Sequence, residues 1–322
     1  MRTTGGGAPA AASSERATGS TSPPPHVPCP LPREECSLPA LPGAALFAQR
    51  LKGTPWCVLP LLAGAGPEHM ATDEALLNAA AQEAIPPTLR FYTWSPPAVS
   101  LGRFQRPEGI HLDYATARGW DIVRRPTGGR GVLHQHELTY AIVLPPSVVH
   151  GVGVRSSYAV LTGLLEAGLS ALLGRCERSA EGRTGNEPDS SAAGATASGS
   201  AARTLHQPNC FALPAECDTL VGGRKLVGSA QVRRDGALLQ HGAILLDAEP
   251  EAWQQLFQEV GRVITLRDLL GARPSPECVI AALCGGLERA GIAFRSSKPG
   301  DGAGDLLRPW PERGTPGPRL SP

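Results

Sequence analysis

Aromatic side chains are scarce in this sequence: Phe, Trp and Tyr together make up 5% of its 322 residues. Glycine and proline, by contrast, supply more than a fifth of the chain, well above the roughly 12% usual in globular proteins. Such a chain cannot be packed core throughout, yet a hydrophobic fraction of 41% excludes disorder over its full length. We therefore expect some segments to fold and others to remain disordered.

The sequence also lacks an excess of charge of either sign. Lys and Arg number 30 against 29 Asp and Glu, and no block of like charges occurs. Because nucleic-acid binding depends on a basic surface, this balance argues against a nucleic-acid binder. No stretch reaches the roughly 18 continuous apolar residues of a membrane span, since residues 159–174 are interrupted by Glu166 and several glycines. The sequence predicts a soluble protein without a membrane segment.

The eight cysteines form no Cys-X-X-Cys pair, and no charged-then-apolar signal peptide follows Met1. This pattern favours a reduced compartment, the cytoplasm, in which each thiol is either an inert core residue or a reactive one. An organelle transit peptide is the alternative, because Arg2 and Arg16 lie among Ser and Thr. Nearby glutamates, such as Glu15, argue against it.

Three segments are predicted to be disordered. Of the first 50 residues, 32 are Gly, Ala, Pro, Ser or Thr, so residues 1–53 are expected to form a tail that buries too little apolar area to fold. Residues 179–204 contain no large apolar side chain and predict a flexible insertion. Residues 296–322 are again rich in Gly and Pro. The folded unit is therefore expected at residues 54–295.

Within this unit, strand and helix periods are mixed rather than strictly alternating, which favours an α+β fold with a central mixed β-sheet flanked by helices. Strands are predicted at 56–62, 89–94, 98–101, 120–125 and 138–144, and a hairpin at 225–233 and 237–246. Helices are predicted at 67–85, at 156–173 with Ser156 as N-cap, at 250–260 and at 276–290.

A glycine-rich segment, Arg124 to Gly131, directly follows a predicted strand. Gly128 and Gly129 allow the backbone to approach a ligand closely, while Arg125 and Arg130 supply positive charge. The spacing matches neither the Walker motif nor the dinucleotide fingerprint. A binding loop is the functional interpretation, and a solvated glycine-rich hairpin is the alternative.

Cys210 and Lys225 are 15 residues apart and form the candidate catalytic pair. A thiolate is a nucleophile, and a neighbouring ammonium lowers the pKa of a thiol. By spacing alone, however, an inert buried Cys beside an exposed Lys is the stronger interpretation. His134 and His136 are expected on one side of a strand, but no third ligand follows at metal spacing, so no metal is predicted. His241 is expected to be a hydrogen-bonded core histidine.

Taken in order, several motifs resemble the lipoate and biotin protein ligase superfamily, in particular its octanoyltransferase branch of the LipM type. The motifs begin with Met70-Ala71-Thr72-Asp73-Glu74-Ala75, Leu89-Arg90-Phe91-Tyr92 and Ser100-Leu101-Gly102-Arg103-Phe104-Gln105. They continue with the glycine-rich segment and Val132-Leu133-His134, Glu137-Leu138-Thr139-Tyr140, Cys210-Phe211, Gly223-Arg224-Lys225, Gly228-Ser229-Ala230-Gln231 and Gln240-His241-Gly242. The resemblance covers nearly all of the predicted folded unit, which it implies is a ligase-type catalytic domain.

The resemblance implies transfer of an octanoyl group from octanoyl-acyl carrier protein to a lysine of a lipoyl domain, such as that of the glycine-cleavage H protein. Cys210 is the implied nucleophile and Lys225 its catalytic partner, and neither ATP nor metal is required. The implied substrate-binding residues are Arg125, Gly128, Gly129, Arg130, His134, Gly228, Ser229 and Ala230. Three alternatives stay open: an amidotransferase acting between lipoyl domains, an ATP-dependent lipoate ligase, and a non-enzymatic homologue that binds acyl carrier protein.

Overall fold

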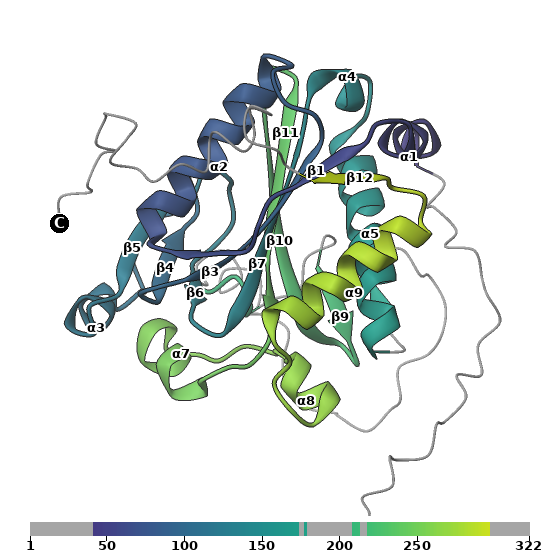
Figure 1. Ribbon diagram of the computed structural model, residues 1–322. Helices are drawn as coiled ribbons and strands as arrows, with labels where there is room; N and C mark the ends of the chain where they lie inside the picture. The colour runs from purple at the N-terminus through teal and green to yellow at the C-terminus, as the bar shows by residue number, and fades with distance from the viewer. Residues whose placement is uncertain (1–40, 174–176, 179–207, 213–217, 297–322) are drawn as a thin grey trace, which may run out of the picture. The chain divides into compact units, whose positions relative to one another are not determined.

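The computed structural model describes residues 41–173, 177–178, 208–212 and 218–296. Most of the predicted N-terminal tail, the whole insertion at 179–204 and nearly all of the predicted C-terminal tail lie outside these residues. The described part contains one large and one small β-sheet with helices on both sides of the large sheet (Figure 1). The prediction of an α+β fold with a mixed sheet flanked by helices is confirmed.

The large sheet has the strand order β12-β1-β3-β7-β11-β10-β9-β8, and β2 pairs with β3 beside this path. Strands β1 and β2 pair in parallel with β3, whereas the neighbours from β3 to β9 are antiparallel. Its strands are β1 (Trp56–Val58), β2 (Leu62–Gly64), β3 (Thr88–Trp94), β7 (Glu137–Leu144), β8 (Glu177–Arg178), β9 (Thr219–Val221), β10 (Arg224–Arg234), β11 (Ala237–Leu245) and β12 (Phe294–Ser296).

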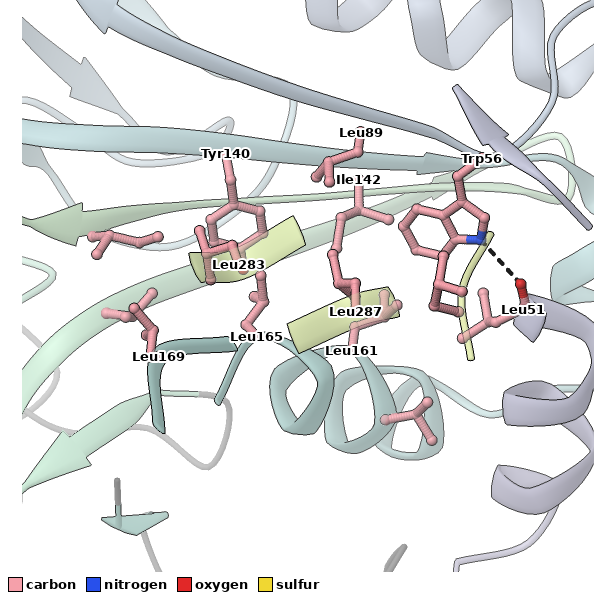
Figure 2. Close-up of a cluster of buried hydrophobic side chains, with 14 of the residues drawn as sticks. Leu51, Trp56, Leu89, Tyr140, Ile142, Leu161, Leu165, Leu169, Leu283 and Leu287 are labelled. Carbon is pink, nitrogen blue, oxygen red and sulfur yellow. Dashed lines mark hydrogen bonds between the residues drawn. The ribbon is translucent and has the colours of Figure 1, made fainter. Parts of the chain in front are cut away.

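One face of the large sheet packs against three helices: α1 (Ala44–Gly53), α5 (Val154–Leu173) and α9 (Pro276–Arg289). In this layer, Leu161 and Leu165 of α5 meet alternate side chains of β7, and Trp56 Nε1 donates to the carbonyl of Leu51 at 3.1 Å (Figure 2). Within the described residues, α5 is long and apolar enough to cross a membrane. Its buried side chains, however, belong to this core layer.

The other face of the large sheet is covered by α2 (Gly66–Ala81) and by the small sheet with its helices. The small sheet has the order β5-β4-β6 and consists of β4 (Ala98–Leu101), β5 (Asp121–Arg124) and β6 (Val132–His134). The remaining helices of the described residues are α3 (Leu112–Ala117), α4 (Pro146–Val149), α7 (Pro250–Phe257) and α8 (Leu266–Leu270). Strand side chains point alternately to opposite faces, so β7 and β11 carry apolar residues toward both layers and are buried throughout.

Several predicted boundaries differ from the structure: the helix predicted at 67–85 ends at Ala81, and the one predicted at 250–260 ends at Phe257. Three further differences change the interpretation of a segment. Residues 44–53 were included in the disordered tail, but they form α1, because Phe47 and Leu51 are one helical turn apart and both are fully buried. The single strand predicted at 56–62 is two short strands, β1 and β2. Ser156 lies inside α5 rather than at its N-cap, and its hydroxyl donates to the carbonyl of Pro42 at 2.8 Å.

Candidate active site

The glycine-rich loop between β5 and β6 is shaped by the side chain of Arg125. This guanidinium is buried and donates to the carbonyls of Gly128 (2.9 Å), Arg130 (2.6 Å) and Ser100 (3.0 Å). Gly129 has φ +94°, and a Cβ there would lie 2.7 Å from Arg125 Nη2. Burial lowers the pKa of Arg125. Arg125 therefore holds the loop conformation while also lining the pocket described below.

A second contact fixes the loop from the side of β4. A Cβ on Gly102 would lie 2.0 Å from the carbonyl oxygen of Gly129, so only glycine allows the two backbones to come this close. The amide of Arg103 donates to the carbonyl of Thr127 at 2.8 Å. The loop is thus packed directly on the end of β4.

Cys210 is joined to the end of this loop by backbone hydrogen bonds. Its amide donates to the carbonyl of Gly131 at 2.8 Å, and the Gly131 amide donates to the carbonyl of Pro208 at 2.8 Å. Asn209 and Gly131 form an isolated parallel bridge. Gln105 Nε2 donates to the same Pro208 carbonyl at 2.9 Å. These contacts bring the predicted nucleophile to the glycine-rich loop, although the two are far apart in sequence.

Lys225 lies beside Cys210, as the catalytic interpretation predicts. Its Nζ is 3.8 Å from Cys210 Sγ and donates to the Cys210 carbonyl at 2.9 Å. The lysine is only 2% exposed, so the alternative of an exposed Lys is wrong. A Cβ at position 228 would lie 3.0 Å from Lys225 Cε, and the glycine there makes room for the lysine stem.

The ammonium of Lys225 has a partner that the sequence did not indicate. Asp218 Oδ2 lies 2.6 Å from Nζ, and the carboxylate side chain is 1% exposed. Asp218 immediately precedes β9, which pairs with β10 so that Leu220 lies opposite Lys225. The hairpin register therefore places the carboxylate beside the ammonium, and no local sequence pattern reveals this.

Cys210 opens onto a pocket between the two sheets. Its lining combines apolar side chains with the glycines of β10 and β11, and it includes five of the predicted binding residues: Arg125, His134, Gly228, Ser229 and Ala230. The other lining residues are Met70, Tyr92, Trp94, Ser100, Val132, Thr139, His241, Gly242 and Ala243. The predicted binding residues Gly128, Gly129 and Arg130 belong to the loop and do not line this pocket.

His134 is held rigidly in the pocket wall. Its Nδ1 lies 2.7 Å from Glu137 Oε1, its Nε2 lies 2.7 Å from Ser100 Oγ, and its ring stacks on Trp94 at 3.9 Å between centroids. Burial lowers the pKa of His134, and the charge of Glu137 partly offsets this effect.

His136 instead lies outside the strand, with Nδ1 3.3 Å from Arg273 Nη1. Within the described ranges, no group of three potential metal ligands is found.

His241 is part of a buried polar network behind the pocket. Its Nδ1 lies 3.0 Å from Asp73 Oδ2, and its Nε2 lies 2.7 Å from Thr127 Oγ1 of the glycine-rich loop. Arg90 Nη1 lies 2.5 Å from Asp73 Oδ1. Burial opposes ionisation of Asp73, but Arg90 and His241 more than offset it and lower the pKa of this carboxyl. The prediction of a hydrogen-bonded His241 is confirmed, but its place in the pocket wall was not foreseen.

Comparison with known proteins identifies the family of this chain. The sequence matches the lipoyl protein ligase A/B catalytic domain over residues 66–288, which is more than half of the chain and includes Cys210, Asp218 and Lys225. The chain belongs to this family. The octanoyltransferase LipM of Kyrpidia tusciae is 38% identical over 257 residues, covering 73% of this chain and 86% of that protein. The octanoyltransferase LipM of Symbiobacterium thermophilum is 42% identical over 202 residues, covering 61% and 67%.

Solved structures of lipoyl protein ligases share the fold of this family member. A putative lipoate protein ligase from T. acidophilum with bound lipoic acid has a TM-score of 0.58 at 24% identity, covering 79% of this chain and 92% of that one. Lipoate-protein ligase A bound with ATP gives the same TM-score at 23% identity and the same coverage. These likenesses support the fold. This member of the lipoyl protein ligase family is an acyltransferase, as its relatives at 38% and 42% identity show.

Proposed function

We propose that this acyltransferase moves an octanoyl group from the phosphopantetheine thioester of octanoyl-acyl carrier protein to a lysine of a lipoyl domain, with the glycine-cleavage H protein as acceptor. The observation that carries the proposal is the 3.8 Å approach of Lys225 Nζ to Cys210 Sγ, where Cys210 lines a pocket. Relatives named octanoyltransferase LipM support the octanoyl group as cargo.

In the first half-reaction, Cys210 Sγ attacks the carbonyl carbon of the acyl thioester. The bond from that carbon to the pantetheine sulfur breaks, pantetheine leaves as a thiol, and the octanoyl group remains on Cys210. The Lys225 ammonium stabilises negative charge on the sulfur and donates to the carbonyl oxygen in the tetrahedral intermediate.

In the second half-reaction, the ε-amine of the acceptor lysine attacks the acyl-enzyme carbonyl. The bond to Cys210 Sγ breaks, the thiol is restored and an amide is released. The octanoyl chain occupies the pocket, where Met70, Trp94, Val132 and Ala243 supply apolar surface. Exchange between two thioesters is nearly neutral in free energy, whereas amide formation drives the sequence forward.

Intact-protein mass spectrometry tests this proposal. Incubation with octanoyl-acyl carrier protein without ATP should add one octanoyl group, and octanoylated lipoyl domain should follow when the acceptor is added. Cys210→Ser should abolish the thioester adduct. Cys278→Ser, which removes an exposed thiol on α9, is the matched control and should keep it. An adduct that persists unchanged in the Cys210 variant would overturn the proposal.

The same assay separates the alternatives. An ATP-dependent lipoate ligase is an alternative because the fold is similar to that of lipoate-protein ligase A. Such an enzyme would need free lipoate and ATP, and its activity would survive loss of Cys210. An amidotransferase would accept octanoyl from an octanoylated lipoyl domain rather than from acyl carrier protein. A protein that only binds the carrier would form no acyl-enzyme.

The location we propose is the cytoplasm. Cys210, Cys278 and Cys284 are free thiols, as expected in a reducing compartment. Fractionation of cells that produce the tagged protein, with a cytoplasmic marker enzyme beside it, tests this expectation. Recovery in a membrane or periplasmic fraction would contradict it.

A further inference from the structure

Asp218 is the acidic partner of the catalytic lysine. Its carboxylate oxygen lies 2.6 Å from Lys225 Nζ, and both side chains are at least 98% buried. We propose that Asp218 is a positioning residue that keeps Lys225 a cation through both half-reactions, so that the sulfur of Cys210, and not Lys225, receives the proton of the incoming amine. This inference rests on the proposed function and deepens it.

The need for a second anion arises when Cys210 is acylated. Before acylation, the Cys210 sulfur lies 3.8 Å from the Lys225 ammonium, which therefore faces the negative charge that develops on this sulfur as it attacks. In the acyl-enzyme this sulfur carries no charge, and a buried ammonium without an anion would be favoured to lose its proton. Asp218 supplies the anion at this stage, while the Cys210 carbonyl accepts a second hydrogen bond at 2.9 Å. Lys225 then remains charged and aimed at the acyl group.

Both half-reactions balance without a proton acceptor other than sulfur. In the first, the proton of the Cys210 thiol is transferred to the departing pantetheine sulfur as one carbon–sulfur bond replaces another. In the second, the attacking amine forms the amide bond, the bond from carbon to Cys210 Sγ breaks, and a proton of that amine is transferred to the sulfur. Lys225 donates hydrogen bonds in both steps and gives up no proton.

The other groups around Lys225 fit this assignment. The Phe211 ring centroid lies 4.9 Å from Nζ and favours a cation there. Arg125 is a second cation in the lining of the same pocket as Cys210. Glu166 of α5 contacts β9, where its Oε1 is 3.4 Å from Thr219 Oγ1. Asp218 lies at ion-pair distance from the lysine.

The pH dependence of the two steps, each measured in a single turnover by rapid quench and mass spectrometry, tests the proposal. From about pH 6 to about pH 9, the wild-type rate of aminolysis should show no alkaline fall. Asp218→Asn should lose at least about tenfold at the alkaline end and less at the acid end, because its buried ammonium deprotonates more easily. In Asp218→Asn with Lys225→Arg, the alkaline fall should disappear, because a guanidinium keeps its proton.

Lys225→Arg alone gives a second, independent outcome. Arginine cannot accept a proton, so this variant should retain aminolysis if Lys225 acts as a cation and lose it if Lys225 is the base. Asp247→Asn, which breaks an Asp–Arg pair outside the pocket, is the matched control for Asp218→Asn and should leave the profile unchanged. Circular dichroism checks folding in each case.

Two results would overturn the proposal: an Asp218→Asn profile parallel to that of the wild type, or a Lys225→Arg protein that forms the acyl-enzyme but cannot transfer the acyl group. A wild-type protein that forms no acyl-enzyme at all would instead contradict the proposed function. The failure of one is therefore distinguishable from the failure of the other.

Discussion

Thr127 Oγ1 and His241 Nε2 lie 2.7 Å apart, joining the glycine-rich loop to the central strand β11. Asp73 Oδ2 lies 3.0 Å from Nδ1 of the same ring and accepts a hydrogen bond from that nitrogen, so Nε2 is left to accept from the Thr127 hydroxyl. All three side chains are buried. The orientation of the loop thus depends on a tautomer set by a carboxylate on α2.

Thr127→Val should break this link while keeping the side-chain volume. We expect a loss of about 1–3 kcal/mol in the free energy of unfolding, because His241 Nε2 would be buried without a donor. We also expect slower acylation of Cys210. Thr116→Val, which removes an exposed hydroxyl on α3, is the control and should change neither. Urea unfolding and the mass-spectrometric acylation assay provide both readouts. Wild-type stability in the Thr127 variant would contradict the role assigned to the hydrogen bond.

Gly102→Ala should displace the glycine-rich loop. The new Cβ would lie 2.0 Å from a backbone oxygen, which cannot rotate away as a side chain can, so the loop must shift. We expect a fall in melting temperature and loss of acyl-enzyme formation. Gly53→Ala at the end of α1, where nothing lies within 4 Å, should leave the melting temperature unchanged or slightly higher. Equal effects of the two substitutions would refute this explanation.

The protein should lose stability as the pH falls from about 6.5 toward 4. Burial, followed by the charge of Arg90, lowers the pKa of His69 from 6.5 to about 4. The unfolded chain therefore takes up a proton in this range while the folded protein does not, and the free energy of unfolding decreases. At pH 5 the loss from His69 is about 2 kcal/mol. His134, whose pKa is also lowered by burial, adds a loss of the same sign.

Urea unfolding at several pH values, compared between variants, tests the origin of this slope. His69→Gln should show a shallower decrease than the wild type, since glutamine does not titrate. His150→Gln, which changes an exposed histidine, should keep the full decrease. If both variants gave the wild-type slope, His69 would not be its source.

Phe47→Ala should destabilise the protein by about 3–5 kcal/mol, because a fully buried aromatic side chain is replaced by a cavity. Leu46, its neighbour in α1, is 47% exposed, and Leu46→Ala should cost far less. Thermal or urea unfolding of the two variants measures the difference. Similar small losses would mean that α1 contributes little to the core.

The sequence predicted most elements of the fold because their apolar periodicity is local. Helix α1 was missed because its four buried side chains were averaged with the glycine-, alanine- and proline-rich residues before them. The parallel pairing of β1 with β12 could not be predicted either, since a three-residue strand carries no local information about its partner.

At the site, the sequence motifs predicted that Cys210 and Lys225 form a pair, although the spacing of these two residues alone did not. Asp218 was missed because its role depends on the register of β9 and β10, and a lone carboxylate in the sequence has no such signal. His241 was interpreted as a core histidine, which is correct for its hydrogen bonds. Its contact with Thr127 appears only when β11 and the glycine-rich loop are brought together in space.

The parallel pairing of β1 and β12 also has a consequence for how the chain folds during synthesis. The amide of Trp56 donates to the carbonyl of Ala293, so one edge of the sheet is completed by residues at the far end of the described fold. Until those residues leave the ribosome, β1 has an open edge and Ile292 is missing from the core. The native cooperativity of the fold should therefore appear only once residues 292–296 have emerged from the ribosome.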